Sequence, residues 1–209
     1  NGTVSTAEST GALTLSSGHN VITVTPGAGG STTMTFASMS RTAGASVLFR
    51  GTSLGSIPGP NVSTIMFTTA PTAIMFGGAG AANSTTINVI KGAFGDNSLI
   101  GNGTDMVTYN IGNTNGLRLL NGAGFSGEYS STLATNANVK LTANTPASTV
   151  SVNSLILNGF DITNASATIT IASGTLAGNI LIGTANTIAG ANTTLGITTF
   201  ELNIHTTAN

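Results

Sequence analysis

The sequence predicts an all-β fold, and within that class a β-solenoid in which short strands stack in successive coils around an irregular central insertion. Three observations lead to this prediction. Short segments alternate apolar and polar residues with period 2, clusters rich in Gly and Asn separate these segments, and good helix formers such as Glu, Lys, Gln and Arg are rare. A stacked β-sandwich is the alternative arrangement of such strands.

The strands and turns can be placed along the chain from these patterns. Alternation of apolar side chains with Thr or Ser predicts strands at 13–15, 21–24, 34–36, 150–152 and 169–171. Clusters containing Gly, Asn and Pro predict turns at 26–30, 56–61, 77–83 and 101–104. Gly and Asn suit these turns because both tolerate positive φ angles.

The composition favours the solenoid over the sandwich. Coils that stack about 4.8 Å apart repeat small residues at their corners and Asn or Thr in ladders, and about 25 residues per coil would give about eight coils. We expect Val, Ile, Leu, Met and Phe in the core and Thr, Ser and Asn outside. Residues 1–86 and 136–209 are expected to form coils, and 87–135 an irregular, loop-rich coil or insertion, within one continuous domain.

Charge and composition exclude several classes of protein. Only 5% of the residues are charged, against about 25% in ordinary soluble proteins, and the net charge of −1 offers no basic surface for nucleic acid. No stretch approaches about 18 consecutive apolar residues, so the chain is not expected to be embedded in a membrane. It contains no Cys, which excludes disulfides and thiolate metal sites. Because the first residue is Asn1 and no leader pattern follows it, we expect a portion of a longer chain.

A series of short motifs resembles a known family. In chain order these are "TVTPGAGG", "RTAGASVLFRGTSLG", "IMFTTAPT", "NGTDMVTYN", "NGLRLL", "NVKLTAN", "SVNSLILNG" and "ATITIASGTL". Together they are similar to the autotransporter-associated β-strand repeat proteins, which are large secreted or surface proteins of Gram-negative and planctomycete-like bacteria. The resemblance implies a right-handed parallel β-helix with a structural or adhesive role at the cell surface, and it implies no catalytic residues.

The segment 102–120 concentrates charged side chains in a chain that has few of them. Asp105 is predicted to cap a turn after "GNGT", with Arg118 paired to it or bonded to loop carbonyls, above a buried face of Leu117 and Leu119. The enzymatic alternative needs two carboxylates that face one cleft about 5–10 Å apart. Asp105 and Glu128 are the pair that this alternative would use, and the other acids in the body of the chain are Asp96 and Asp161.

No cofactor or metal site is expected. His19 and His205 lie near opposite ends of the sequence, and neither has an acid or a second His nearby in the chain, whereas a metal needs three or four converging ligands. Both are predicted to be exposed on turns or strand faces. The Gly-rich stretches lack the Lys-Ser/Thr ending and the following helix of a phosphate-binding loop.

Two apolar runs and the last segment are candidate assembly contacts. The runs flank "TTAPT" and contain more apolar side chains than one face of a strand can bury, so they either lie in the core or contact another subunit. The segment 193–206 alternates and is predicted to be an edge strand or an intersubunit contact. The candidate residues are Ile65, Met66, Phe67, Ile74, Met75, Phe76, Phe200, Leu202 and Ile204.

The function expected from these patterns is structural rather than enzymatic. The first hypothesis is an extracellular or cell-surface module that self-associates into a filament, sheath or coat. The second is an adhesin passenger that binds surface glycans or matrix polymers. The third, from the enzyme class, is a polysaccharide-active β-helix that uses Asp105 and Glu128.

Overall fold

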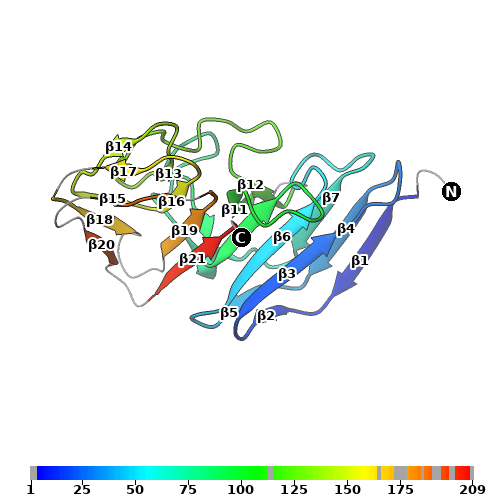
Figure 1. Cartoon of the computed structure of the whole chain (residues 1–209). Helices are drawn as coiled ribbons and strands as arrows, with labels where there is room; N and C mark the ends of the chain where they lie inside the picture. The colour runs from blue at the N-terminus through cyan, green and yellow to red at the C-terminus, as the bar shows by residue number, and fades with distance from the viewer. Residues whose placement is uncertain are drawn as a thin grey trace.

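The chain is all-β in a computed structural model that describes residues 4–112, 115–163, 166–171, 178–184, 186–189, 194–197 and 201–207 (Figure 1). Among these residues there is no α-helix, and one 3-10 turn, η1, spans Thr72–Ile74. The prediction of an all-β fold is confirmed. The predicted turn clusters lie between strands, and positive φ angles occur in them at Gly29, Asn61, Asn83 and Gly103.

In the first half of the chain, three successive strands pair in parallel with the next three. The pairs are β1 with β4, β2 with β5, and β3 with β6, and Thr6 is paired with Thr32, 26 residues further on. Strand β7 continues the first sheet and β10 continues the third. The strands are β1 (Thr6–Thr10), β2 (Leu13–Leu15), β3 (His19–Val24), β4 (Thr32–Phe36), β5 (Met39–Arg41), β6 (Ser46–Gly51), β7 (Ser63–Phe67), β8 (Met75–Phe76), β9 (Val89–Ile90), β10 (Ala93–Asp96), β11 (Asp105–Tyr109) and β12 (Leu117–Leu119).

Parallel pairing stops in the middle of the chain. Strands β8 and β9 form an antiparallel pair, and β10, β11 and β12 form an antiparallel meander that ends the sheet β3-β6-β10-β11-β12. Long loops precede and follow β11 and β12 (Figure 1).

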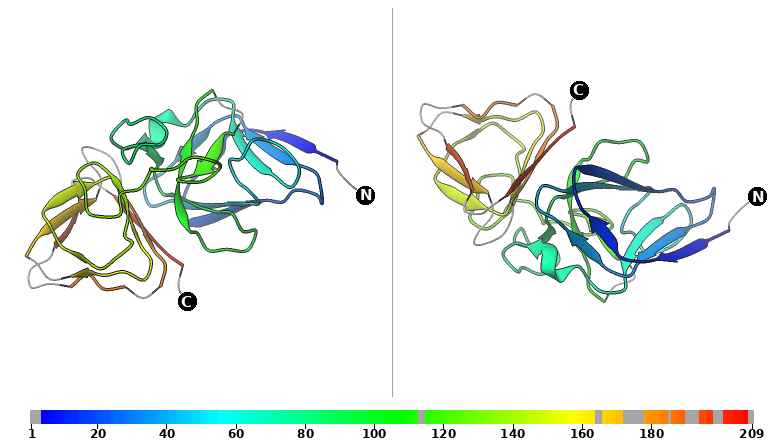
Figure 2. Two further views of the ribbon diagram at one scale, coloured as in Figure 1. Left: turned by 90° about the horizontal axis from the view of Figure 1, so that it is seen from above. Right: turned by 90° about the horizontal axis from the view of Figure 1, so that it is seen from below.

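The second half of the chain returns to parallel pairing on three sides of a second core. The three sheets are β13-β16-β19-β21, β14-β17 and β15-β18-β20, and Figure 2 shows the roughly triangular outline that they make. The predicted alternating segment 193–206 is two strands rather than one, β20 and β21, each the outermost strand of its sheet. The strands are β13 (Asn138–Lys140), β14 (Thr145–Pro146), β15 (Val150–Val152), β16 (Ser154–Leu157), β17 (Ile162–Thr163), β18 (Thr168–Ile171), β19 (Gly178–Ile182), β20 (Thr194–Ile197) and β21 (Leu202–Thr206).

A third apolar cluster joins the two halves. The two largest sheets pack face to face through it, with Leu48 and Phe94 from the first half against Ile156 and Leu181 from the second. The outermost strands of these sheets meet, because the ring of His205 in β21 stacks on that of His19 in β3. At the opposite side, Lys140 of β13 reaches β11. The strand orders of the two packed sheets therefore run in opposite directions, and β3 and β21 lie at the same end of the interface.

A row of buried polar side chains crosses the sheet of the second half at this interface. Asn138, Ser154, Asn179 and Asn203 occupy paired positions on β13, β16, β19 and β21. The expectation that Asn and Ser point to solvent is wrong for these residues, because the outer face of their sheet is covered by the first half of the chain. The predicted Asn ladder is present, but at an interface.

The side chains of this row form hydrogen bonds with backbone groups of the first half that lack a backbone partner. The side chain of Asn179 accepts a hydrogen bond from the amide of Gly92 and donates one to the carbonyl of Ile90, both at 2.9 Å. Asn138 donates to the carbonyl of Ile87 at 2.9 Å. Buried backbone groups must be paired, so these side-chain amides allow the segment 87–92 to be buried against the sheet of the second half.

Replacing Asn179 with Ala should lower the free energy of unfolding by about 1–3 kcal/mol, because it leaves the Gly92 amide and the Ile90 carbonyl buried without partners. Urea unfolding followed by circular dichroism measures the change. Asn144→Ala is the control, since Asn144 is exposed and should change stability far less. Equal effects of the two substitutions would contradict the bridging role of Asn179.

Candidate functional site

A buried ion pair joins Arg118 of β12 to Glu128 in the following loop. Both side chains are completely buried. The guanidinium donates from Nη1 to Oε2 and from Nη2 to Oε1 of the carboxylate, both at 2.6 Å, in the bidentate geometry that suits these groups. It also donates from Nη1 to the carbonyl of Leu119 at 3.1 Å and from Nε to Oδ1 of Asn110 at 3.2 Å.

The same carboxylate holds two loops in place. Its oxygens accept hydrogen bonds from the backbone amides of Asn83 (3.1 Å) and Asn121 (2.9 Å), both at positive φ. Burial alone would raise the pKa of Glu128, but the hydrogen bonds from Arg118 and the two amides outweigh it and hold the pKa below its usual value. Gly55 packs against the backbone of Arg118, where a Cβ would lie 2.0 Å from the Cβ of Arg118.

The predicted partner of Arg118 is wrong. Strand pairing sets Arg118 opposite Thr108, three residues and roughly 10 Å along β11 from Asp105. Asp105 instead accepts a hydrogen bond from Nζ of Lys140 at 2.7 Å. The carbonyl that Arg118 contacts is that of Leu119, which lies in strand β12 rather than in a loop, and the predicted burial of Leu117 and Leu119 is confirmed.

The predicted turn cap is also assigned to the wrong acid. Asp96 caps the turn instead. Its Oδ1 accepts a hydrogen bond from the amide of Ser98 at 2.8 Å, and its Oδ2 accepts one from the amide of Gly103 at 2.9 Å. Asp105 lies inside a strand, where its backbone pairs with Gly95. The turn that ends at "NGTD" is therefore held by Asp96, which precedes the motif in the sequence.

The two acids of the enzymatic alternative form ion pairs with different side chains, Glu128 with Arg118 and Asp105 with Lys140. Both oxygens of Glu128 are engaged and its side chain has no exposed surface, so it offers nothing to a substrate. Asp105 is paired with Lys140; burial raises its pKa above the usual value, and the attraction of Lys140 only partly offsets this. The hydroxyl of Tyr129 lies beside it and accepts from the amide of Met106 at 2.9 Å.

His19 and His205, which lie near opposite ends of the sequence, are neighbours in the structure; both are on strands as predicted, with His19 exposed and His205 half-buried. The rings of His19 and His205 stack with centroids 4.9 Å apart, and His205 also stacks on Phe94 at 4.8 Å. Nδ1 of His19 lies 2.9 Å from Oγ of Ser46, and Nε2 of His205 is hydrogen-bonded to the carbonyl of Asn102. The fold brings together residues that are far apart in the sequence by returning β21 to the first coil.

A second long-range pair accompanies this contact. Glu201 accepts hydrogen bonds from Arg41 and, at 2.9 Å, from the amide of Gly44. Burial acts to raise the pKa of Glu201, but the hydrogen bonds from Arg41 and Gly44 hold it below its usual value. No local sequence pattern could have identified this pair, whose members are 160 residues apart.

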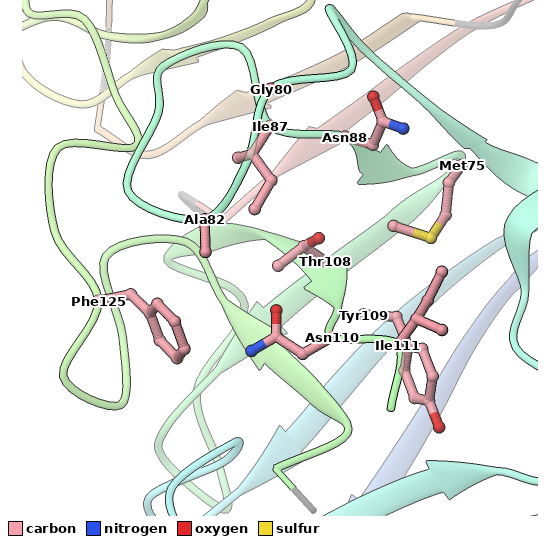
Figure 3. A pocket seen from close by; sticks show the side chains of 10 residues that line it. All are labelled: Met75, Gly80, Ala82, Ile87, Asn88, Thr108, Tyr109, Asn110, Ile111 and Phe125. Atoms are coloured by element: carbon pink, nitrogen blue, oxygen red, sulfur yellow. The ribbon is translucent and has the colours of Figure 1, made fainter. Parts of the chain in front are cut away.

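A pocket of about 350 Å³ lies over the outer face of β11, beside the ion pair. In Figure 3, Thr108 and Asn110 project between Phe125 on one side and Met75 on the other. The ring of Phe125 covers the guanidinium of Arg118, whose Cζ is 3.8 Å from the ring centroid. The remaining lining residues are Gly80, Ala82, Ile87, Asn88, Tyr109 and Ile111, so no charged side chain lines the pocket.

The candidate assembly residues fall into three groups. Three are buried in the apolar clusters, which favours the core alternative for them: Ile65, Phe67 and Phe76. Four are half-buried: Met66, Ile74, Met75 and Leu202. Ile204 is 56% exposed, and Phe200 lies outside the described residues.

The described part of the chain contains no group of three or more His, Asp or Glu side chains placed to hold a metal ion. It also contains no helix with the length and apolar character needed to cross a membrane.

Comparison with known family models, curated proteins and solved structures found no match to this chain.

Replacing Glu128 with Gln should destabilise the protein by about 3–5 kcal/mol, because it leaves the guanidinium of Arg118 buried without a counter-charge. The matched control is Asp105→Asn, which breaks a partly exposed ion pair and should cost about 1 kcal/mol or less. Urea unfolding of the three proteins gives both values. If Glu128→Gln proves no more costly than Asp105→Asn, the ion pair does not have the role described.

Acidification should weaken the contact between the first and last coils. Burial, His205 and Arg50 all lower the pKa of His19 below 6.5, so the folded protein binds fewer protons there than the unfolded chain. Stability is therefore expected to fall as the pH drops below about 6.5.

Thermal unfolding at pH 7, 6 and 5 measures this effect. His19→Gln should have a flatter pH profile over that range, whereas Asp105 and the other acids contribute equally to both proteins. Identical profiles would rule out His19 as the source of the pH dependence.

Proposed function

We propose that the chain is an extracellular structural module of a bacterial surface protein, with the fold of a right-handed parallel β-helix, and that it self-associates through its last coil. The repeat of strand pairing at 26 residues supports the helix in the first half, and three parallel sheets around one core support it in the second. The handedness and the surface location rest on the resemblance to autotransporter-associated repeat proteins.

The main support for the proposal is on β21, where the apolar row that crosses the sheet ends in an exposed side chain. Ile204 is in register with Ile180, which in turn is in register with Leu155. Ile180 and Leu155 are buried, but Ile204 is 56% exposed because β21 is the outermost strand of its sheet in the described part of the chain. An outermost strand with an uncovered apolar row favours addition of another strand or coil.

The first coil ends differently. On β1, Glu8 takes the position that Met34 and Ile65 occupy on the next two strands. Ile65 is fully buried, so a carboxylate stands in an inward-facing row at this edge. An inward-facing charge is a common protection against strand addition, so association is expected at the last coil rather than the first.

The geometry also favours one form of association. Because β21 of one molecule would pair with β21 of another, two molecules that join there are related by a two-fold axis and close as a dimer. A filament, sheath or coat then requires a further contact elsewhere on the surface. The adhesin alternative would instead leave the module monomeric.

Replacing Ile204 with Lys should abolish self-association without unfolding the protein, because the side chain is exposed and lies on the outermost strand. Deletion of residues 193–209 should have the same effect on association. Light scattering after gel filtration gives the mass, and negative-stain electron microscopy shows whether larger assemblies form.

The matched control is Ile100→Lys, since Ile100 is 86% exposed and lies in a loop. It should associate like the unchanged protein. An unchanged protein that is monomeric at every concentration, or an Ile204→Lys variant that associates normally, would contradict the proposal.

A further inference from the structure

The pocket over β11 contains a buried hydroxyl that the protein leaves unpaired. Thr108 is 1% exposed, and its Oγ1 has no hydrogen-bond partner within the described part of the chain. Its side chain lines the pocket together with Asn110, two residues further along the same face of β11 (Figure 3). Nearly all buried polar groups in folded proteins have a partner, so this hydroxyl in the pocket wall is able to take one from a ligand.

Hydrogen-bond donors fix the orientation of two side-chain amides in the pocket, those of Asn110 and Asn88. Oδ1 of Asn110 accepts from Nε of Arg118, which can only donate, so Nδ2 is the free end of that amide. Likewise, Oδ1 of Asn88 accepts from the backbone amide of Ala79 at 3.1 Å, which leaves its Nδ2 free. No hydrogen bond among the described residues uses either Nδ2.

The remaining surface is apolar and carries no charge. Ile87, Met75 and Phe125 supply carbon surface around the polar groups. The nearest charge, on Arg118, lies beneath Phe125 and is neutralised by Glu128. A pocket of this kind discriminates against ions, and it suits a ligand with hydroxyl groups on one side and C–H groups on the other.

We propose that this pocket binds one neutral sugar residue. The hydroxyl of Thr108 and the free amide of Asn110 hydrogen-bond to sugar hydroxyls, and the C–H face of the ring packs against Phe125. The volume of about 350 Å³ lies in the range of small-molecule pockets, about 300–1,000 Å³, at its lower end. Affinity for a single sugar in so small a site is expected in the millimolar range.

The test is a titration of the isotope-labelled protein with glucose, mannose, galactose and N-acetylglucosamine, each added separately and followed by amide chemical shifts. At least one sugar should shift amides of β11 and of the lining residues of the pocket. Thr108→Val should weaken that binding roughly two- to tenfold, as expected for loss of one hydrogen bond. Ala82→Phe, which fills the pocket from an exposed position, should abolish it.

Each variant has a matched control. Thr64 is also 1% exposed with an unpaired Oγ1, but it lies in β7 and does not line the pocket, so Thr64→Val should bind like the unchanged protein. Ala81 is an exposed neighbour of Ala82 that does not line the pocket, so Ala81→Phe should also bind normally. The two Thr→Val changes remove unpaired hydroxyls and are not expected to unfold the chain.

Two results would overturn the proposal. One is the absence of shifts at the pocket with all four sugars. The other is binding that persists unchanged in Thr108→Val and Ala82→Phe, which would place the sugar elsewhere and leave an internal water as the partner of Thr108. Neither result bears on self-association through β21, which uses a different part of the surface.

Discussion

The ion pair between Arg118 and Glu128 organises the middle of the molecule. Removing two charges from water costs several kcal/mol for each ion, so such a pair adds less to stability than to geometry. Here the carboxylate fixes the loops at Asn83 and Asn121, and the guanidinium orients Asn110. The loops form one wall of the pocket over β11, so the shape and the polarity of that pocket both depend on one buried contact.

The need to pair every buried backbone group constrains how the two stacks of coils meet. Strands within a parallel sheet pair with one another, but the segment around Ile90 and Gly92 has backbone groups that no strand pairs. The side chain of Asn179 imitates a peptide group and supplies the missing donor and acceptor. Around this polar row, Ile156 and Leu181 provide the apolar contact. The interface therefore combines the apolar area that favours association with polar contacts that set its register.

Sequence patterns predicted the strands well and the partners of polar residues poorly. Alternation such as that at 150–152 reports two faces of a strand, and this is sufficient to locate the strand. It does not report that the outer face of a sheet packs against a second sheet, so the burial of Asn138 and Asn179 was missed. Charge pairs have no periodic signal at all, and proximity in the chain wrongly favoured Asp105 as the partner of Arg118.

The return of the last strand to the first coil has a mechanical consequence. A tensile load applied between β3 and β21 would not shear the hydrogen bonds of all the coils at once, because the two strands lie at the same end of oppositely directed stacks. The load would first open the stacked rings of His19 and His205 and the pair between Arg41 and Glu201. Only then would it peel β21 from β19 and the following coils one after another. Under such a load the module would lengthen in steps at low force rather than resist as a rigid rod.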